Sequence, residues 1–156
     1  PDDPAELAGL VDRLLAAGRP SPEQVAGARS GLAGILVPHA GLAYSGAVAA
    51  AAWGLASAVA MEPPHESTIV LLGTNHSAGW LDGVGVCDAG AWGSPLGDAE
   101  VAEDLAGEIL GLGPPFVIDR DAHRSEHSLE VQLPFIRAAL PRARRARARA
   151  PRQSAA

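Results

Sequence analysis

The segment TIVLLGTNHSA, residues 68–78, carries the strongest strand pattern in the chain. Its first five residues form a continuous β-branched and aliphatic run that ends at Gly73, as expected of a strand buried on both faces. A second apolar run, AGILV at residues 33–37, ends at Pro38 and predicts another buried strand. Residues 83–87 and 116–118 predict two weaker strands.

Four predicted helices alternate with these strands. Asp3 as N-cap and Pro4 at the first helical position predict a helix that ends near Gly18. Residues 45–59, 98–110 and 126–140 predict three more, and Pro134 is expected to kink the last one. This alternation is typical of an α/β domain with a mainly parallel sheet that helices cover on both faces.

Length and composition limit the classes of protein to consider. The 156 residues suffice for one domain, and an apolar fraction of 47% is ordinary for a globular protein. The single cysteine, Cys87, excludes an intrachain disulfide and a four-cysteine zinc site. The single cysteine is compatible with a reducing compartment, so we expect a cytoplasmic protein. No run of 18 apolar residues occurs, so we expect no membrane span. The chain starts at Pro1 without a methionine or signal peptide, so we expect further residues before it.

The basic residues are concentrated at the C-terminal end. Residues 1–136 contain five Arg and 18 acidic residues, whereas residues 137–156 contain seven Arg and no acidic residue. Such a tail is able to neutralise phosphates, but it has no aromatic side chain to stack on a base, so nucleic-acid binding is not expected. The string RARRARARAPR, residues 142–152, is also what a shifted reading frame through GC-rich DNA would produce. We therefore expect a domain over residues 1–141 and a disordered or frameshifted tail over residues 142–156.

Both strong strands are followed at once by a histidine motif. His39 lies in PHAG, residues 38–41, and His76 lies in GTNHS, residues 73–77. Because the carboxyl ends of parallel strands meet at one edge of a sheet, these imidazoles are expected to share a metal ion or a substrate. The alternatives are two structural histidines, or an anion held at the helix start after Ser45. The anion site lacks a Gly-rich phosphate loop.

A third motif is EHSLEVQLPF, residues 126–135. His127 shares a helix face with Glu130, so it is a candidate general acid or base whose ring a carboxylate orients. The alternative is an ordinary helix start in which Glu126 complements the helix dipole and His127 is solvated. His65 and His123 lie in polar segments and are given no role. Cys87 is expected to be a buried apolar side chain.

These motifs together resemble the Memo family, which includes AmmeMemoRadiSam system protein B. The matching strings stand in the family's order and spacing, and the resemblance covers about residues 3–140. They are VPHAGLAYSGAVAA (37–50), LLGTNHSA (71–78), WGSPLGD (92–98) and EHSLEVQLPFI (126–136). The resemblance implies a three-layer α/β/α sandwich similar in fold to the class III extradiol dioxygenases, which use non-haem iron.

The resemblance also assigns residues and a function. His39 and His76 match the family's two metal-ligand histidines, and His127 is similar to a position that lines the same cleft. A further ligand, cysteine in many members, comes from a later half of the domain, so we expect a chain truncated at both ends that binds metal weakly and is inactive. The implied function is an iron- or copper-dependent oxidoreductase acting on a small-molecule or peptide ligand. The alternative is a non-catalytic metal- or partner-binding module that acts beside radical SAM system proteins.

Overall fold

The computed structural model describes residues 1–60 and 68–140, together with the backbone of residues 145–150. The helices are α1 (Pro4–Ala17), α2 (Pro22–Arg29), α3 (Leu42–Ala60), α4 (Glu103–Leu110), α5 (His127–Glu130) and α6 (Leu133–Ala139), with one 3-10 turn at Asp121–His123. The strands are β1 (Thr68–Leu72), β2 (Val84–Val86), β3 (Ala91–Trp92), β4 (Ala99–Glu100), β5 (Phe116–Ile118) and β6 (Arg145–Ala150). The α/β class that the sequence predicts is confirmed.

Local capping signals account for the N-terminal helices. The side chain of Asp3 accepts a hydrogen bond from the backbone N–H of Glu6, and Gly18 ends α1 as predicted. Helix α2 was not predicted, although Ser21 and Gln24 form a capping box at its start. Helix α3 begins at Leu42, earlier than predicted. Ser45 lies inside it and donates its hydroxyl to the carbonyl of Ala40, so it is not the N-cap.

The strand predicted at residues 33–37 is wrong. This segment is irregular, because none of the residues that the structure describes forms a strand ladder with it. Ile35 and Val37 still pack against the main core, while Leu36 is 98% exposed. His39 therefore lies on an irregular segment that leads into α3, and only His76 follows a strand.

The predicted helix over residues 126–140 is also wrong as a single element. It is divided into α5 and α6 by a turn at Val131 and Gln132, and Pro134 lies in the first turn of α6. Proline has no N–H and is tolerated best in a first turn, so a new helix starts where a kink was expected. Helix α4 begins at Glu103 because the preceding residues form the short β3–β4 hairpin.

The sheet is mixed, and three of its five strand pairings are parallel. Strand β6 is central: it pairs in parallel with β1 and β4 and antiparallel with β2. Strand β2 pairs in parallel with β5, and β3 with β4 antiparallel. Strand β6 belongs to the tail for which we expected disorder. Whether that tail is native stays a prediction, and residues 141–144 and 151–156 lie outside the described part.

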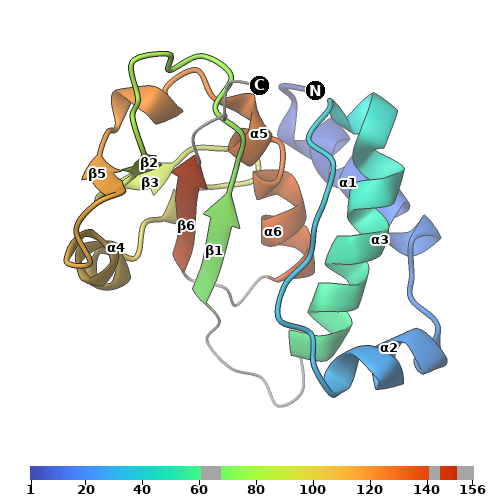
Figure 1. The fold of residues 1–156 in the computed structure, drawn as a ribbon. Coiled ribbons are helices and arrows are strands. Elements are labelled where there is room, and N and C mark those ends of the chain that lie inside the picture. Colours follow the sequence, from blue (N-terminus) through green and yellow to red (C-terminus); the bar gives the residue numbers. More distant parts are fainter. Residues whose placement is uncertain (61–67, 141–144, 151–156) are drawn as a thin grey trace.

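Most of the core lies between the helices and β1. Helices α1, α3 and α6 gather on one side of β1 and β6, and α4 lies beside β5 on the other (Figure 1). Phe135 and Val11 are fully buried in the larger cluster, and Leu71 joins it from β1. Val70 and Leu72 are 45% and 66% exposed, so β1 buries one face and not both as predicted.

Helix α3 is long and apolar enough, by length and composition, to cross a membrane. In the structure it packs against α1, α2 and α6. Trp53 donates its indole N–H to Gln132, and Ser57 donates its hydroxyl to the carbonyl of Ala139. These contacts are those of a helix packed within a domain.

Candidate metal centre

Three histidines from separate segments of the chain converge on one point. His39 precedes α3, His76 lies in the loop after β1, and His127 begins α5. One nitrogen from each ring lies within 4.8 Å of the other two. The ring centroids are 5.1 Å apart for His39 and His76, 5.8 Å for His39 and His127, and 4.6 Å for His76 and His127. His39 is half-buried, and the other two rings are exposed, so the cluster is open to solvent.

A buried amide holds the segment that carries His39. Gln132, which is 4% exposed, donates from Nε2 to the carbonyl oxygen of Pro38 at 3.1 Å. Its Oε1 accepts the indole N–H of Trp53 at 2.9 Å. The irregular segment before His39 is thereby fixed to α3 and to the turn between α5 and α6.

The loop that carries His76 is closed by Asn75. The Asn75 side chain accepts from the backbone N–H of Ala78 at 2.8 Å and donates to the carbonyl of the same residue at 2.9 Å. Gly73 begins this loop, and a Cβ built there would lie 2.6 Å from Leu129. Only glycine therefore allows the end of β1 to approach the start of α5 so closely.

A buried carboxylate joins that loop to α5. Glu126 accepts from the backbone N–H of His76 at 2.9 Å and from the backbone N–H of Ser128 at 2.8 Å. Its Oε1 also lies 2.9 Å from Nδ1 of His76 and 3.9 Å from Nδ1 of His127. Burial alone would raise the pKa of Glu126, but the hydrogen bonds from His76 and Ser128 outweigh it and lower the pKa to about 2. The group is therefore a carboxylate at neutral pH.

Comparison with known proteins identifies the family. The profile described as Memo-like protein matches residues 1–147. The chain belongs to the Memo-like protein family. It is 37% identical over 138 residues to a MEMO1 family protein of Methanocaldococcus jannaschii, a match that covers 88% of this chain and 47% of that protein. A MEMO1 family protein of Desulfurococcus amylolyticus is 39% identical over 141 residues, with 87% and 47% covered.

A third relative, from Ignicoccus hospitalis, is 41% identical over 108 residues, a match covering 69% of this chain and 36% of that protein. The Memo-like chain thus spans about half the length of the curated relatives that it matches.

The structure brings together the three residues that the sequence singled out. His39 and His76 were predicted as metal ligands and His127 as a catalytic acid or base; the three rings lie in one cluster, while these roles stay predictions. The carboxylate beside the rings is Glu126, whereas sequence reasoning paired His127 with Glu130, which is exposed. Helical spacing predicts only contacts between residues close together in one helix. The contact between Glu126 and His76 joins residues 50 apart in the chain, so that spacing could not reveal it.

His123 and Cys87 lie outside the cluster. His123 is 6% exposed and packs edge-on against Trp92, and neither ring nitrogen has a hydrogen-bond partner among the described residues. The ring is therefore buried, although it lies in the polar segment that the sequence predicts. Burial lowers the pKa of His123 below its ordinary value of 6.5. Cys87 is half-buried just after β2, and His65 lies outside the described residues.

The cluster fits a metal ion in its donor atoms and spacing. Two nitrogens bound to one tetrahedral ion at about 2.0–2.1 Å lie about 3.4 Å apart. The three histidine nitrogens lie within 4.8 Å of one another, so binding one ion would require each pair to approach by at most about 1.4 Å. Since three imidazoles leave a fourth position free, the arrangement has the form of an open site.

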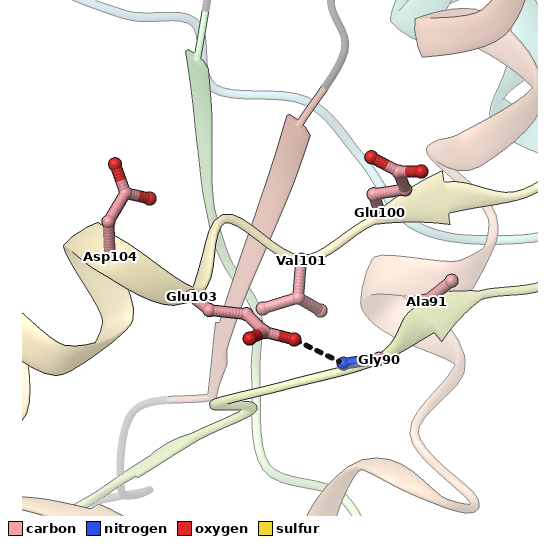
Figure 2. Close-up of a pocket in the computed structure, with 6 residues that line it drawn as sticks. All are labelled: Gly90, Ala91, Glu100, Val101, Glu103 and Asp104. Carbon is pink, nitrogen blue, oxygen red and sulfur yellow. Dashed lines mark hydrogen bonds between the residues drawn. The ribbon is translucent and has the colours of Figure 1, made fainter.

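A separate hollow lies between the β3–β4 hairpin and α4 (Figure 2). Its lining residues are Gly90, Ala91, Glu100, Val101, Glu103 and Asp104. Glu103 accepts a hydrogen bond from the backbone N–H of Gly90 at 3.4 Å. Glu103 and Asp104 stand in the first turn of α4, where acidic side chains complement the helix dipole. Glu103 and Asp104 therefore have a structural explanation at the start of α4, and none of the three clustered histidines lines the hollow.

Proposed function

We propose that this Memo-like chain binds one transition-metal ion through His39, His76 and His127, with one coordination position open to solvent. The observation that carries the proposal is the convergence of three imidazoles from three separate segments. Two buried side chains support the cluster: Glu126 bonds to His76, and Gln132 bonds to the carbonyl just before His39. They are 2% and 4% exposed. Such supporting hydrogen bonds are typical of metal sites.

Imidazole ligands suit zinc, copper, iron and nickel. Within that set we propose iron or copper, because the family resemblance implies an iron- or copper-dependent oxidoreductase. A metal held at such a site acts as a Lewis acid on whatever occupies its open position. His127 is assigned here to the metal, in place of the general acid or base role expected from sequence. The family's later cysteine would then be a further ligand in longer members.

Metal titration tests the site directly. We expect wild-type protein to bind one equivalent of Fe²⁺ under anaerobic conditions, and His39→Ala, His76→Ala and His127→Ala each to weaken binding strongly. His123→Leu is the matched control, because it removes a histidine outside the cluster. Calorimetry and elemental analysis give the affinity and the stoichiometry. Equal binding by all four variants would show that the site assignment is wrong.

For the longer proteins of the family we propose a three-layer α/β/α sandwich, a cytoplasmic location and an oxidoreductase of dioxygenase type. The open position supports this activity, because a substrate or dioxygen needs a free site on the metal. Oxygen uptake by a full-length relative with catechol-like and peptide substrates tests it. No uptake across such a panel would contradict it.

A second candidate is a non-catalytic metal- or partner-binding module that acts with radical SAM system proteins. Leu36 and Leu72 are 98% and 66% exposed, so their apolar side chains are accessible to another polypeptide surface. Co-purification of a full-length relative with a radical SAM system protein tests this candidate. Charged substitutions at these two positions should abolish the co-purification. That result would favour this candidate over the enzyme.

A further inference from the structure

We infer that Glu126 is a positioning residue that fixes the ring orientation and tautomer of His76, so that this ring presents Nε2 to the metal. This inference rests on the proposed function of the cluster. It goes beyond the ligand set by naming the group that orients His76 before any metal arrives.

The first step is the geometry of the carboxylate. The Glu126 side chain is 0% exposed, whereas His76 and His127 are 34% and 58% exposed. Oε1 of Glu126 lies 2.9 Å from Nδ1 of one ring and 3.9 Å from Nδ1 of the other. Both rings therefore turn Nδ1 toward the buried oxygen, and the two rings stack with an interplanar angle of 29°.

The second step is the proton. Both carboxyl oxygens of Glu126 accept a backbone N–H, Oε2 from His76 and Oε1 from Ser128. With its oxygens used as acceptors, the 2.9 Å contact with His76 requires a proton on Nδ1. In the neutral ring this leaves the lone pair on Nε2, which is the form that binds a metal. Carboxylates hydrogen-bonded in this way also make imidazole a more basic ligand.

The third step is the anchoring of Glu126 itself. Oε2 accepts the backbone N–H of His76 at 2.9 Å, and Oε1 accepts the backbone N–H of Ser128 at 2.8 Å. The carboxylate is thus held by two backbone groups that do not depend on the imidazoles. Its position is set by the fold, and the rings adjust to it.

The tautomer can be measured without any metal. In ¹⁵N-labelled, metal-free protein, long-range ¹H–¹⁵N correlation spectra at pH 8 are expected to show His76 protonated on Nδ1 only. A ring protonated on Nε2 would overturn the inference. Because the wild-type protein is used, this result does not depend on how well any variant folds.

Variants then test the effect on the metal. We expect Glu126→Gln to weaken Co²⁺ binding 10–100-fold and to change the visible absorption of the bound Co²⁺, with partial recovery in Glu126→Asp. Glu130→Gln is the matched control on the same helix, because Glu130 is exposed; its affinity should stay within about twofold of wild type. Equal affinities and spectra for folded Glu126→Gln and Glu130→Gln would refute the inference.

The two proposals fail in different ways. Wild-type protein that binds no Co²⁺ would refute the metal site but leave the tautomer result standing. Wild-type protein that binds Co²⁺ with His76 protonated on Nε2 would refute only the role of Glu126.

Discussion

Gly73 offers a direct test of how the site is built. It begins the His76 loop, and a Cβ at this position would overlap Ser128 Oγ and lie 2.6 Å from Cδ2 of Leu129. Carbon atoms pack at about 3.5–4.0 Å, so the overlap with Leu129 is about 1 Å. Ser128 and Leu129 are 4% and 1% exposed, and buried side chains in a close-packed interior move only by displacing their neighbours. We therefore expect Gly73→Ala to displace α5 relative to β1.

The packing cost of Gly73→Ala can be measured against a matched control. Overpacking of this kind costs about 1–3 kcal/mol, while any Gly→Ala change also stabilises by about 0.4–1 kcal/mol through the unfolded chain. Gly79 lies in the same loop, and a Cβ there meets nothing within 4 Å. Because Gly79→Ala shares the unfolded-state effect, the difference between the two variants isolates the packing cost. For a chain of this size, 1–3 kcal/mol corresponds to about 2–12 °C in Tm.

Thermal unfolding followed by circular dichroism gives this difference. Co²⁺ affinity is the second readout, because a displaced α5 carries Glu126 and His127 away from His76. We expect weaker binding by Gly73→Ala and no change for Gly79→Ala. If the two variants melt within 1 °C of each other and bind Co²⁺ equally, the proposed contact between the end of β1 and the start of α5 is wrong.

Four further predictions concern the core, the His39 segment, pH and the metal. Phe135→Ala should lower the free energy of unfolding by about 3–5 kcal/mol in urea titrations, because Phe135 is fully buried; a loss below 1 kcal/mol would contradict the described core. Gln132→Leu leaves the indole N–H of Trp53 and the carbonyl of Pro38 without this partner, and should cost about 1–3 kcal/mol and also weaken Co²⁺ binding. Burial lowers the pKa of His123 below 6.5, so the unfolded chain binds a proton there before the folded chain does as the pH falls. The free energy of unfolding of the metal-free protein should therefore fall below pH 6.5. Between pH 7.5 and 5.5 this loss should be smaller in His123→Leu. Co²⁺ at 100 times its Kd should stabilise the wild-type protein by about 2.7 kcal/mol, an increase that a chelator abolishes and that His76→Ala lacks.

Local features of the sequence were sufficient for several elements. The caps of α1 at Asp3 and Gly18 and the apolar run of β1 depend on residues close together in the chain, so both elements were predicted within about one residue. The meeting of His39 with His76 was also anticipated. The reason given for it was partly wrong, because His39 lies on an irregular segment held by Gln132 and not at the end of a strand.

The features that were missed depend on contacts between distant residues. Residues 33–37 have the composition of a strand, but a strand also needs a neighbour to hydrogen-bond with, and composition cannot supply that neighbour. The β3–β4 hairpin is only two residues deep on each strand, too short to give an alternating pattern. Strand β6 pairs with three other strands from an Arg/Ala sequence that carries no apolar signal. Glu126 was read as a helix-start residue, which is correct, but its second role arises across 50 residues.

One short segment explains why the three rings meet. Residues 126–132 provide His127 itself, the carboxylate that holds the His76 loop, and the amide that holds the segment before His39. The two supporting side chains, Glu126 and Gln132, are buried, while His76 and His127 are exposed above them. The supporting hydrogen bonds all join groups of the protein, so they do not require a metal to form. The fold therefore preorganises the segments that carry the three rings, so metal binding has less backbone conformational entropy to remove.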